Sequence, residues 1–267
     1  MTSHLVRLLL VGVLLAACQA TAIEPPSQAT TAAPTAAPIA APTPTVRPTP
    51  TAQPSPRPTP TLPPPAAFAM NLYQDGDFVP QHTFEWCVGA SLQIAHNLVE
   101  SDIRSSYEDQ QGLWELARDA SSNSFRGANP VGWTAALNEM GLGPYELVSV
   151  PDYEDALHTA AAAIHDTERP VGLVMWRGRH AWVMSGFESM GDPAIHADFR
   201  VTGVRVLDPL FPHGSGRWGP SPEPNSLLSP EELATQFVVR EPRRWSAALG
   251  TGYFLILPVA AAEADDA

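Results

Sequence analysis

The stretch Gln81-His-Thr-Phe-Glu-Trp-Cys87-Val-Gly-Ala-Ser91 places a single thiol at the point where a helical pattern begins. From Cys87 to Val99, apolar residues recur at helical spacing. A thiolate at a helix start is stabilised by unpaired backbone N–H groups and by the positive end of the helix dipole, which raises its population at neutral pH. Cys87 is therefore a candidate nucleophile. The alternative is a buried, inert small side chain.

The other cysteine, Cys18, closes an N-terminal segment typical of a secretion signal. Arg7 precedes an apolar run, and Leu15-Ala-Ala-Cys18 has the small-residue cleavage pattern. This tetrapeptide resembles a bacterial lipobox, which implies removal of residues 1–17 and lipidation of Cys18. The run is shorter than the about 20 apolar residues that span a bilayer. We therefore expect a lipid anchor on Cys18 and a location at the extracytoplasmic face of the cell membrane.

Composition divides the remainder into a tether, one domain and a tail. Residues 18–67 are rich in Ala, Thr, Pro and Ser, a composition that has too little apolar surface to fold and is biased toward polyproline II geometry. Residues 68–258 carry periodic apolar segments over a length typical of one domain. Residues 259–267 form an acidic tail that we expect to be disordered. An unpaired thiol outside the cytoplasm is open to oxidation, so Cys87 calls for a functional reason.

The charge composition excludes several classes of function. The chain has 28 acidic and 15 basic residues, a formal net charge of −13 and a pI of about 4.9, so we expect no binding to nucleic acid. Every basic residue is Arg, and the lack of Lys excludes Schiff-base chemistry and Ser-Lys dyads. No His or Cys pair has metal-ligand spacing and no Gly-rich loop suits a phosphate, so we expect neither metal nor cofactor.

Apolar periodicity predicts helices first and strands afterwards, following a short extended lead-in over 72–79. The predicted helices cover residues 87–99, 107–120, 130–140 and 152–165. The predicted strands cover 145–150, 171–176, 180–187, 199–207 and 253–257, of which the last four form one antiparallel sheet. Beyond the loop 209–228, the capping box Ser229-Pro-Glu-Glu232 opens a short helix. This order favours an α+β fold in which an N-terminal helical layer packs on an antiparallel β-sheet.

A nucleophilic cysteine needs a base and an orienting group, and among the eight histidines His180 fits best. It follows a Gly-containing turn at the first residue of a predicted strand. The alternative is a structural histidine at a hairpin corner. Asp208 ends the next predicted strand and could accept a hydrogen bond from the other ring nitrogen, although an Asp-Pro pair is by itself a common turn. Adjacent strands would bring the two side chains within reach.

Gln81 adds a fourth element, because its amide N–H could stabilise a developing oxyanion together with the Cys87 backbone N–H. Gln81, five residues, Cys87 with Ala-Ser three and four positions later, Gly178-Arg-His180-Ala and Asp208-Pro resemble the papain-like cysteine peptidase superfamily. The similar branch is the family 39-like group, related to peptidases that process double-glycine bacteriocin leaders. After the cysteine this chain has Val-Gly where many relatives have Gly-Pro.

The resemblance implies a papain-like fold and a role for each residue. Cys87 would be the nucleophile, His180 the general base and then acid, Asp208 the orienting group and Gln81 the oxyanion donor. The whole would be a monomeric lipoprotein, a thiol hydrolase that cleaves a peptide or protein substrate.

Three alternatives remain open. A transferase would use an amine in place of water. A catalytically silent papain-like module would bind a partner through a groove that tryptophans could line, namely Trp114, Trp133, Trp176, Trp182 and Trp218. The extra segment 188–198 would be either a hairpin tip or a cover over the cleft.

Overall fold

The computed structural model describes residues 62–121, 127–242 and 248–260, all within the unit Thr59–Ala267. The predicted signal peptide, Cys18, the tether as far as residue 61 and the end of the tail lie outside the described residues. In the described part, no helix is long and apolar enough to cross a membrane.

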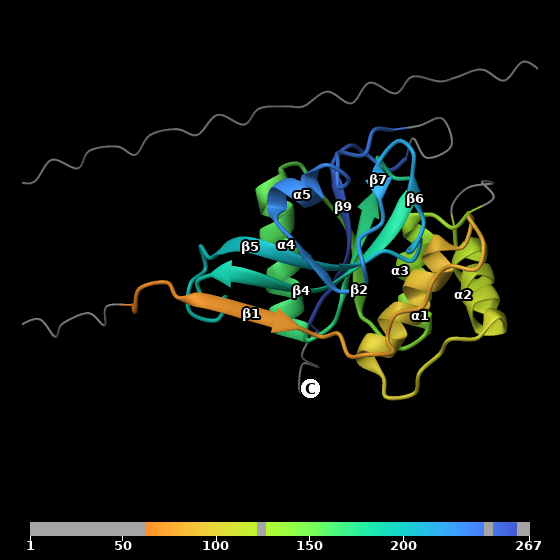
Figure 1. Ribbon diagram of the computed structural model, residues 1–267, viewed down its shortest axis with the longest axis horizontal. Helices are drawn as coiled ribbons and strands as arrows, with labels where there is room; N and C mark the ends of the chain where they lie inside the picture. The colour runs from red at the N-terminus through yellow and green to blue at the C-terminus, as the bar shows by residue number, and fades with distance from the viewer. Residues whose placement is uncertain (1–61, 122–126, 243–247, 261–267) are drawn as a thin grey trace, which may run out of the picture. The chain divides into compact units, whose positions relative to one another are not determined.

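An antiparallel sheet of seven strands organises this unit (Figure 1). Its hydrogen-bonded order is β2-β9-β3-β4-β5-β8, with β1 paired to β4 off this path. The strands are β1 Ala67–Asn71, β2 Tyr145–Val150, β3 Val171–Met175, β4 His180–Met190, β5 Arg200–Leu207, β8 Ser226–Leu228 and β9 Tyr253–Pro258. A separate small hairpin joins β6 Gly214–Ser215 to β7 Gly219–Pro220.

Five helices are described, and they combine with the sheet into the predicted mixture of helix and antiparallel sheet. They are α1 Cys87–Val99, α2 Tyr107–Asp119, α3 Pro130–Glu139, α4 Tyr153–Thr167 and α5 Pro230–Ala234. Side chains of Ser106, Asn129, Asp152 and Ser229 cap α2 to α5 by accepting from first-turn N–H groups. The start of α1 has no such cap.

Two apolar clusters pack against the sheet. One joins α1, α2 and α3 to strand residues that include Val183, and the other joins α4 and α5 to strand residues that include Trp182. Consecutive residues of a strand point to opposite faces. Helices therefore cover both faces of the sheet: α1, α2 and α3 pack on one face, and α4 and α5, which the predicted N-terminal layer did not include, pack on the other.

The extended lead-in predicted over 72–79 is wrong, because this segment turns. The Asp77 carboxylate accepts from the Gln74 N–H at 2.7 Å, and the Asp77 N–H donates to the Gln74 carbonyl at 3.2 Å. Gly76 between them has a φ of 106°. Such local side-chain-to-backbone bonding outcompetes an extended chain. The strand lies just upstream as β1, which pairs with the far half of β4.

The segment 188–198 is a hairpin tip. Strand β4 continues to Met190, and the turn toward β5 follows at the end of β4 that is opposite to His180. This segment therefore does not cover the residues predicted as the site.

Candidate active site

Cys87 is the first residue of α1 and is half-buried, with Trp86 at the N-cap position. Because no side chain caps α1, its first-turn N–H groups are left for another acceptor. The dipole of the thirteen-residue helix adds partial positive charge at this end. The prediction that Cys87 stands at the start of a helix is confirmed.

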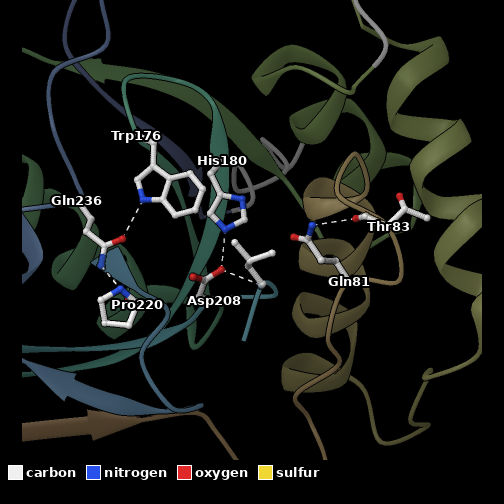
Figure 2. Close-up of polar contacts among 8 residues, drawn as sticks. Gln81, Thr83, Trp176, His180, Asp208, Pro220 and Gln236 are labelled. Carbon is white, nitrogen blue, oxygen red and sulfur yellow. Dashed lines mark hydrogen bonds and ion pairs between the residues drawn. The ribbon is translucent and has the colours of Figure 1, made fainter. Parts of the chain in front are cut away.

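His180 and Asp208 meet where β4 begins and β5 ends. The two strands are antiparallel, with Val183 opposite Leu207, so the start of one lies beside the end of the other. Nε2 of His180 lies 2.6 Å from Oδ1 of Asp208 (Figure 2). The histidine is 6% exposed and the aspartate 0%. Oδ1 also accepts from the Leu210 N–H at 2.9 Å, which fixes the carboxylate at the turn.

The Cys87 side chain lies close enough to this pair to favour the protonated form of His180. With Nε2 on Asp208, the other ring nitrogen, Nδ1, is left for the sulfur. Burial of the ring opposes its protonation, but the hydrogen bond to Asp208, the charge of that carboxylate and the neighbouring Cys87 together raise the pKa of His180 to about 9. A pKa of about 9 favours the charged form of the ring at neutral pH.

Gln81 lies beside the pair but is oriented differently from the prediction. Its backbone N–H donates to the Pro209 carbonyl at 2.7 Å, which ties the segment before α1 to the turn after Asp208. Its side-chain Nε2 donates to the Thr83 carbonyl at 2.8 Å, away from His180 (Figure 2). One amide hydrogen remains for another acceptor. Oε1 is buried without a hydrogen-bond partner among the described residues.

Trp176 was predicted only as one of several tryptophans that could line a groove, and Gln236 was not predicted at all. The Trp176 indole stacks on the His180 ring, with centroids 4.1 Å apart and planes inclined by 22°. Its Nε1 donates to Oε1 of Gln236 at 2.9 Å, and the Gln236 amide donates to the Pro220 carbonyl at 3.3 Å (Figure 2). The indole therefore shields the imidazolium and is held by residues remote in sequence. The only sequence signal was its place in the turn before His180.

Other tryptophans occupy the core. Trp133 is 2% exposed and Trp182 is 0% exposed, and each lies in an apolar cluster, so neither lines a groove. In the described ranges, no three His, Cys, Asp or Glu side chains are grouped in a way that could hold a metal ion.

A buried glutamine fixes the segment that carries Gln81. Gln110 of α2 is 0% exposed and accepts from the His82 N–H at 2.7 Å. Its amide donates to the Pro80 carbonyl at 3.1 Å and to Oε1 of Gln93, on α1, at 2.7 Å. One side chain thus bonds the residues on both sides of Gln81. Nothing in the sequence pattern singled it out.

Comparison with known proteins adds little at the level of residues. No family model and no curated protein matches the chain. Among solved structures it is similar to the peptidase domain of Streptococcus ComA, a bi-functional ABC transporter involved in a quorum sensing pathway. The sequence identity is 16%, the alignment covers 68% of this chain and 97% of that chain, and the TM-score is 0.32. A likeness of this degree identifies no residue of the site.

Proposed function

We propose that this chain is a papain-like cysteine peptidase with Cys87 as nucleophile. One observation supports this above all: the buried His180–Asp208 pair lies close to Cys87 at the uncapped start of α1, and these two neighbours raise the pKa of His180 to about 9. A histidine with a purely structural role needs only one hydrogen-bond partner. The His180 ring instead has both a carboxylate, Asp208, and a candidate nucleophile, Cys87, as neighbours.

In the proposed mechanism, the Cys87 thiolate attacks the carbonyl carbon of a peptide bond. The Cys87 backbone N–H and the second amide hydrogen of Gln81 would stabilise the oxyanion. Protonated His180 gives its proton to the leaving amine as the C–N bond breaks, which leaves an acyl-thioester on Cys87. Neutral His180 then takes a proton from water, whose oxygen attacks the thioester and releases the acid and the thiolate. Asp208 keeps the ring oriented and stabilises its charged form throughout.

We also propose that Cys18 is lipidated and that residues 18–67 tether the domain at the extracytoplasmic face of the membrane. The signal pattern around Cys18 supports this. Replacing Cys18 with Ala in the natural host should prevent incorporation of a labelled fatty acid and move the chain out of the membrane fraction. Incorporation that persists in the Cys18→Ala chain would contradict the proposal.

The peptidase is tested with the full chain in mild detergent and a randomised peptide library, with cleavage followed by mass spectrometry. We expect Cys87→Ala to lower the cleavage rate on the order of 10⁴-fold, because it removes the nucleophile. His180→Ala should have an effect of similar size. Cys18→Ala in the same detergent is the matched control, since it replaces the other cysteine, and should retain full activity.

Alkylation separates a peptidase from a silent module. Iodoacetamide should modify Cys87 at about pH 6 far faster than it modifies a simple thiol, and His180→Ala should abolish this advantage. Rapid alkylation of a chain that cleaves no peptide would indicate a silent module or a transferase. Slow alkylation, equal to that of a simple thiol, would contradict the proposed chemistry itself.

A further inference from the structure

A small depression rich in guanidinium groups lies next to the turn that leads into His180. Its volume is about 90 Å³, and it is lined by Arg177, Arg179, Arg217, Trp218, Glu241 and Pro242. Such a volume suits a small polar group rather than a large side chain. None of these residues takes part in the chemistry proposed above.

Three segments far apart in sequence build this depression. Trp176, which helps to hold these segments together, also stacks on the His180 ring. The turn before β4 provides Arg177 and Arg179, the β6–β7 hairpin provides Arg217 and Trp218, and the segment after α5 provides Glu241. The Trp176 N–H donates to the Gln236 carbonyl at 3.1 Å. Together with the side-chain bonds from Trp176 through Gln236 to Pro220, this joins all three segments.

The charge of the depression is opposite to that of the chain. The chain carries 28 acidic residues against 15 basic ones, yet three guanidiniums and one carboxylate meet here. Glu241 lies 3.7 Å from Arg177. Arg179 forms no ion pair or hydrogen bond with any side chain that the structure describes, and Arg217 only stacks over Trp218, at 5.1 Å. Two guanidiniums thus face solvent without a carboxylate in a strongly acidic protein.

The position of the depression relative to His180 indicates which part of a substrate would reach it. In the proposed mechanism His180 protonates the leaving amine, so the leaving segment lies on the histidine side of the scissile bond. Arg179 immediately precedes His180, and Trp176 stacks on its ring and begins the same turn. Side chains after the scissile bond are therefore the ones that approach this turn.

We propose that the depression is a subsite for a carboxylate located after the scissile bond, so that the enzyme prefers acidic leaving segments. The carboxylate is either an Asp or Glu side chain or the C-terminal carboxylate of the substrate. Arg179 and Arg217 bind it, since guanidinium groups match carboxylates in geometry and charge. This inference rests on the proposed peptidase activity and names its substrate class.

The test compares matched peptides on the full chain. A peptide cleaved in the library is remade with Glu, Gln or Lys at each position after the cut, each with a free or an amidated C-terminus. We expect kcat/KM about tenfold higher for Glu than for Gln at one of these positions, or for the free over the amidated C-terminus. The first outcome assigns the subsite to a side chain and the second to a terminus. Added salt should reduce either preference.

Arg179→Gln/Arg217→Gln should remove the preference while kcat for the Gln peptide stays within about twofold of its starting value. Arg179→Glu/Arg217→Glu should favour the Lys peptide. Arg200→Gln is the matched control. Arg200 is also exposed, but it pairs with Met190 at the other end of β4, roughly 30 Å from His180, and its loss should leave the preference intact. A preference for Glu that survives the double Gln variant, or no preference at all, overturns the proposal.

A binding experiment tests the proposed subsite without requiring peptide cleavage. Fluorescently labelled peptides with Glu, Gln or Lys are titrated onto the Cys87→Ala chain, with and without Arg179→Gln/Arg217→Gln. Tighter binding of the Glu peptide that the double variant loses supports the subsite even if no peptide is ever cleaved. Equal binding of all three peptides rejects the subsite. Absence of cleavage with selective binding would reject only the peptidase proposal.

Discussion

At the scale of single residues, the site depends on how the surroundings of His180 change its protonation. Burial alone would favour a neutral ring, but the interactions of the ring with Asp208 and Cys87 outweigh burial and raise the pKa of His180 to about 9. The stacked Trp176 keeps water from one face of the ring, so these charges act through a medium of low polarity. A ring that is charged at neutral pH is prepared to donate a proton rather than to accept one.

The pH dependence of cleavage follows from this pKa. As the pH rises through about 9, His180 loses the proton that the leaving amine needs, so kcat/KM for a peptide should fall. Alkylation of Cys87 needs no proton donor and should not fall over the same range. The two profiles are measured on one preparation. A cleavage rate that stays flat to well above pH 9 would contradict the assigned role.

The raised pKa of His180 also makes the stability of the fold decrease as the pH rises. Because the pKa of His180 is raised from its ordinary 6.5 to about 9 on folding, the stabilisation is fully present below about pH 6.5. It is lost as the pH rises through about 9. Urea midpoints should therefore decline over this interval in the parent chain and decline less in Asp208→Asn, which keeps a hydrogen-bond acceptor but removes the charge.

At the scale of elements, α1 begins differently from the other described helices, and this difference coincides with the candidate active site. Four of the five described helices begin with a capping side chain, whereas α1 begins with none and its first-turn N–H groups lie at Cys87. The segment that enters α1 is fixed instead by Gln110, a residue of the neighbouring helix. A cap on α1 would compete with the thiolate for the same donors.

The variant Gln110→Leu tests whether Gln110 holds the segment before α1 in place. It would leave Oε1 of Gln93 buried without its partner and would remove the bonds to the His82 N–H and the Pro80 carbonyl, at a cost of about 3 kcal/mol in the free energy of unfolding. Gln111→Leu is the control, since Gln111 bonds only to Glu115 at the surface and its loss should cost under about 0.5 kcal/mol. Urea denaturation measures both. Equal midpoints for the two variants would show that Gln110 does not brace this segment.

Most of the long elements could be predicted from the sequence. The helix 87–99 and the strand 145–150 have the predicted bounds, and the other long elements begin or end within a few residues of them. The pairing of β4 with β5, which joins His180 to Asp208, also followed from the order of strands. Periodicity and capping residues determine these features locally, so a single sequence contains them.

The missed features depend on contacts between distant parts of the chain. Strand β1 forms in a stretch that follows a Pro-rich segment, because β4 offers it a partner. The strands of the β6–β7 hairpin have two residues each, too few to show a period. The stacking of Trp176 depends on Gln236, sixty positions along the chain, and the orientation of the Gln81 amide depends on the Thr83 carbonyl. No local pattern encodes such contacts.

At the scale of the whole molecule, one sheet connects two helical layers through close packing. Gly172 of β3 lies against Trp133 of α3, and a Cβ at position 172 would come within 2.7 Å of two ring atoms of that indole. The same Cβ would lie 2.9 Å from Cβ of Ile256 on β9. The absence of a side chain here is thus a condition for the helices to approach the sheet.

Gly172→Ala should therefore destabilise the fold by about 1–3 kcal/mol, because a methyl group would push α3 off the sheet. Gly112→Ala is the opposite case, since nothing lies within 4 Å of its Cβ position on α2. Alanine is the better helix former, and this variant should gain up to about 1 kcal/mol. Thermal unfolding of both variants checks the pair. A neutral Gly172→Ala would mean that the layers tolerate separation.

The place where β1 joins the sheet also has a mechanical consequence. The register sets Ala67 opposite Met190, ten positions along β4 from His180. A pull on the chain ahead of Ala67 is carried first by the β1–β4 hydrogen bonds at that end of the sheet, roughly 30 Å from the start of β4 (Figure 1). In a molecule anchored through Cys18 as proposed, drag would thus load the sheet at the end remote from His180 and leave the geometry around Cys87 undisturbed.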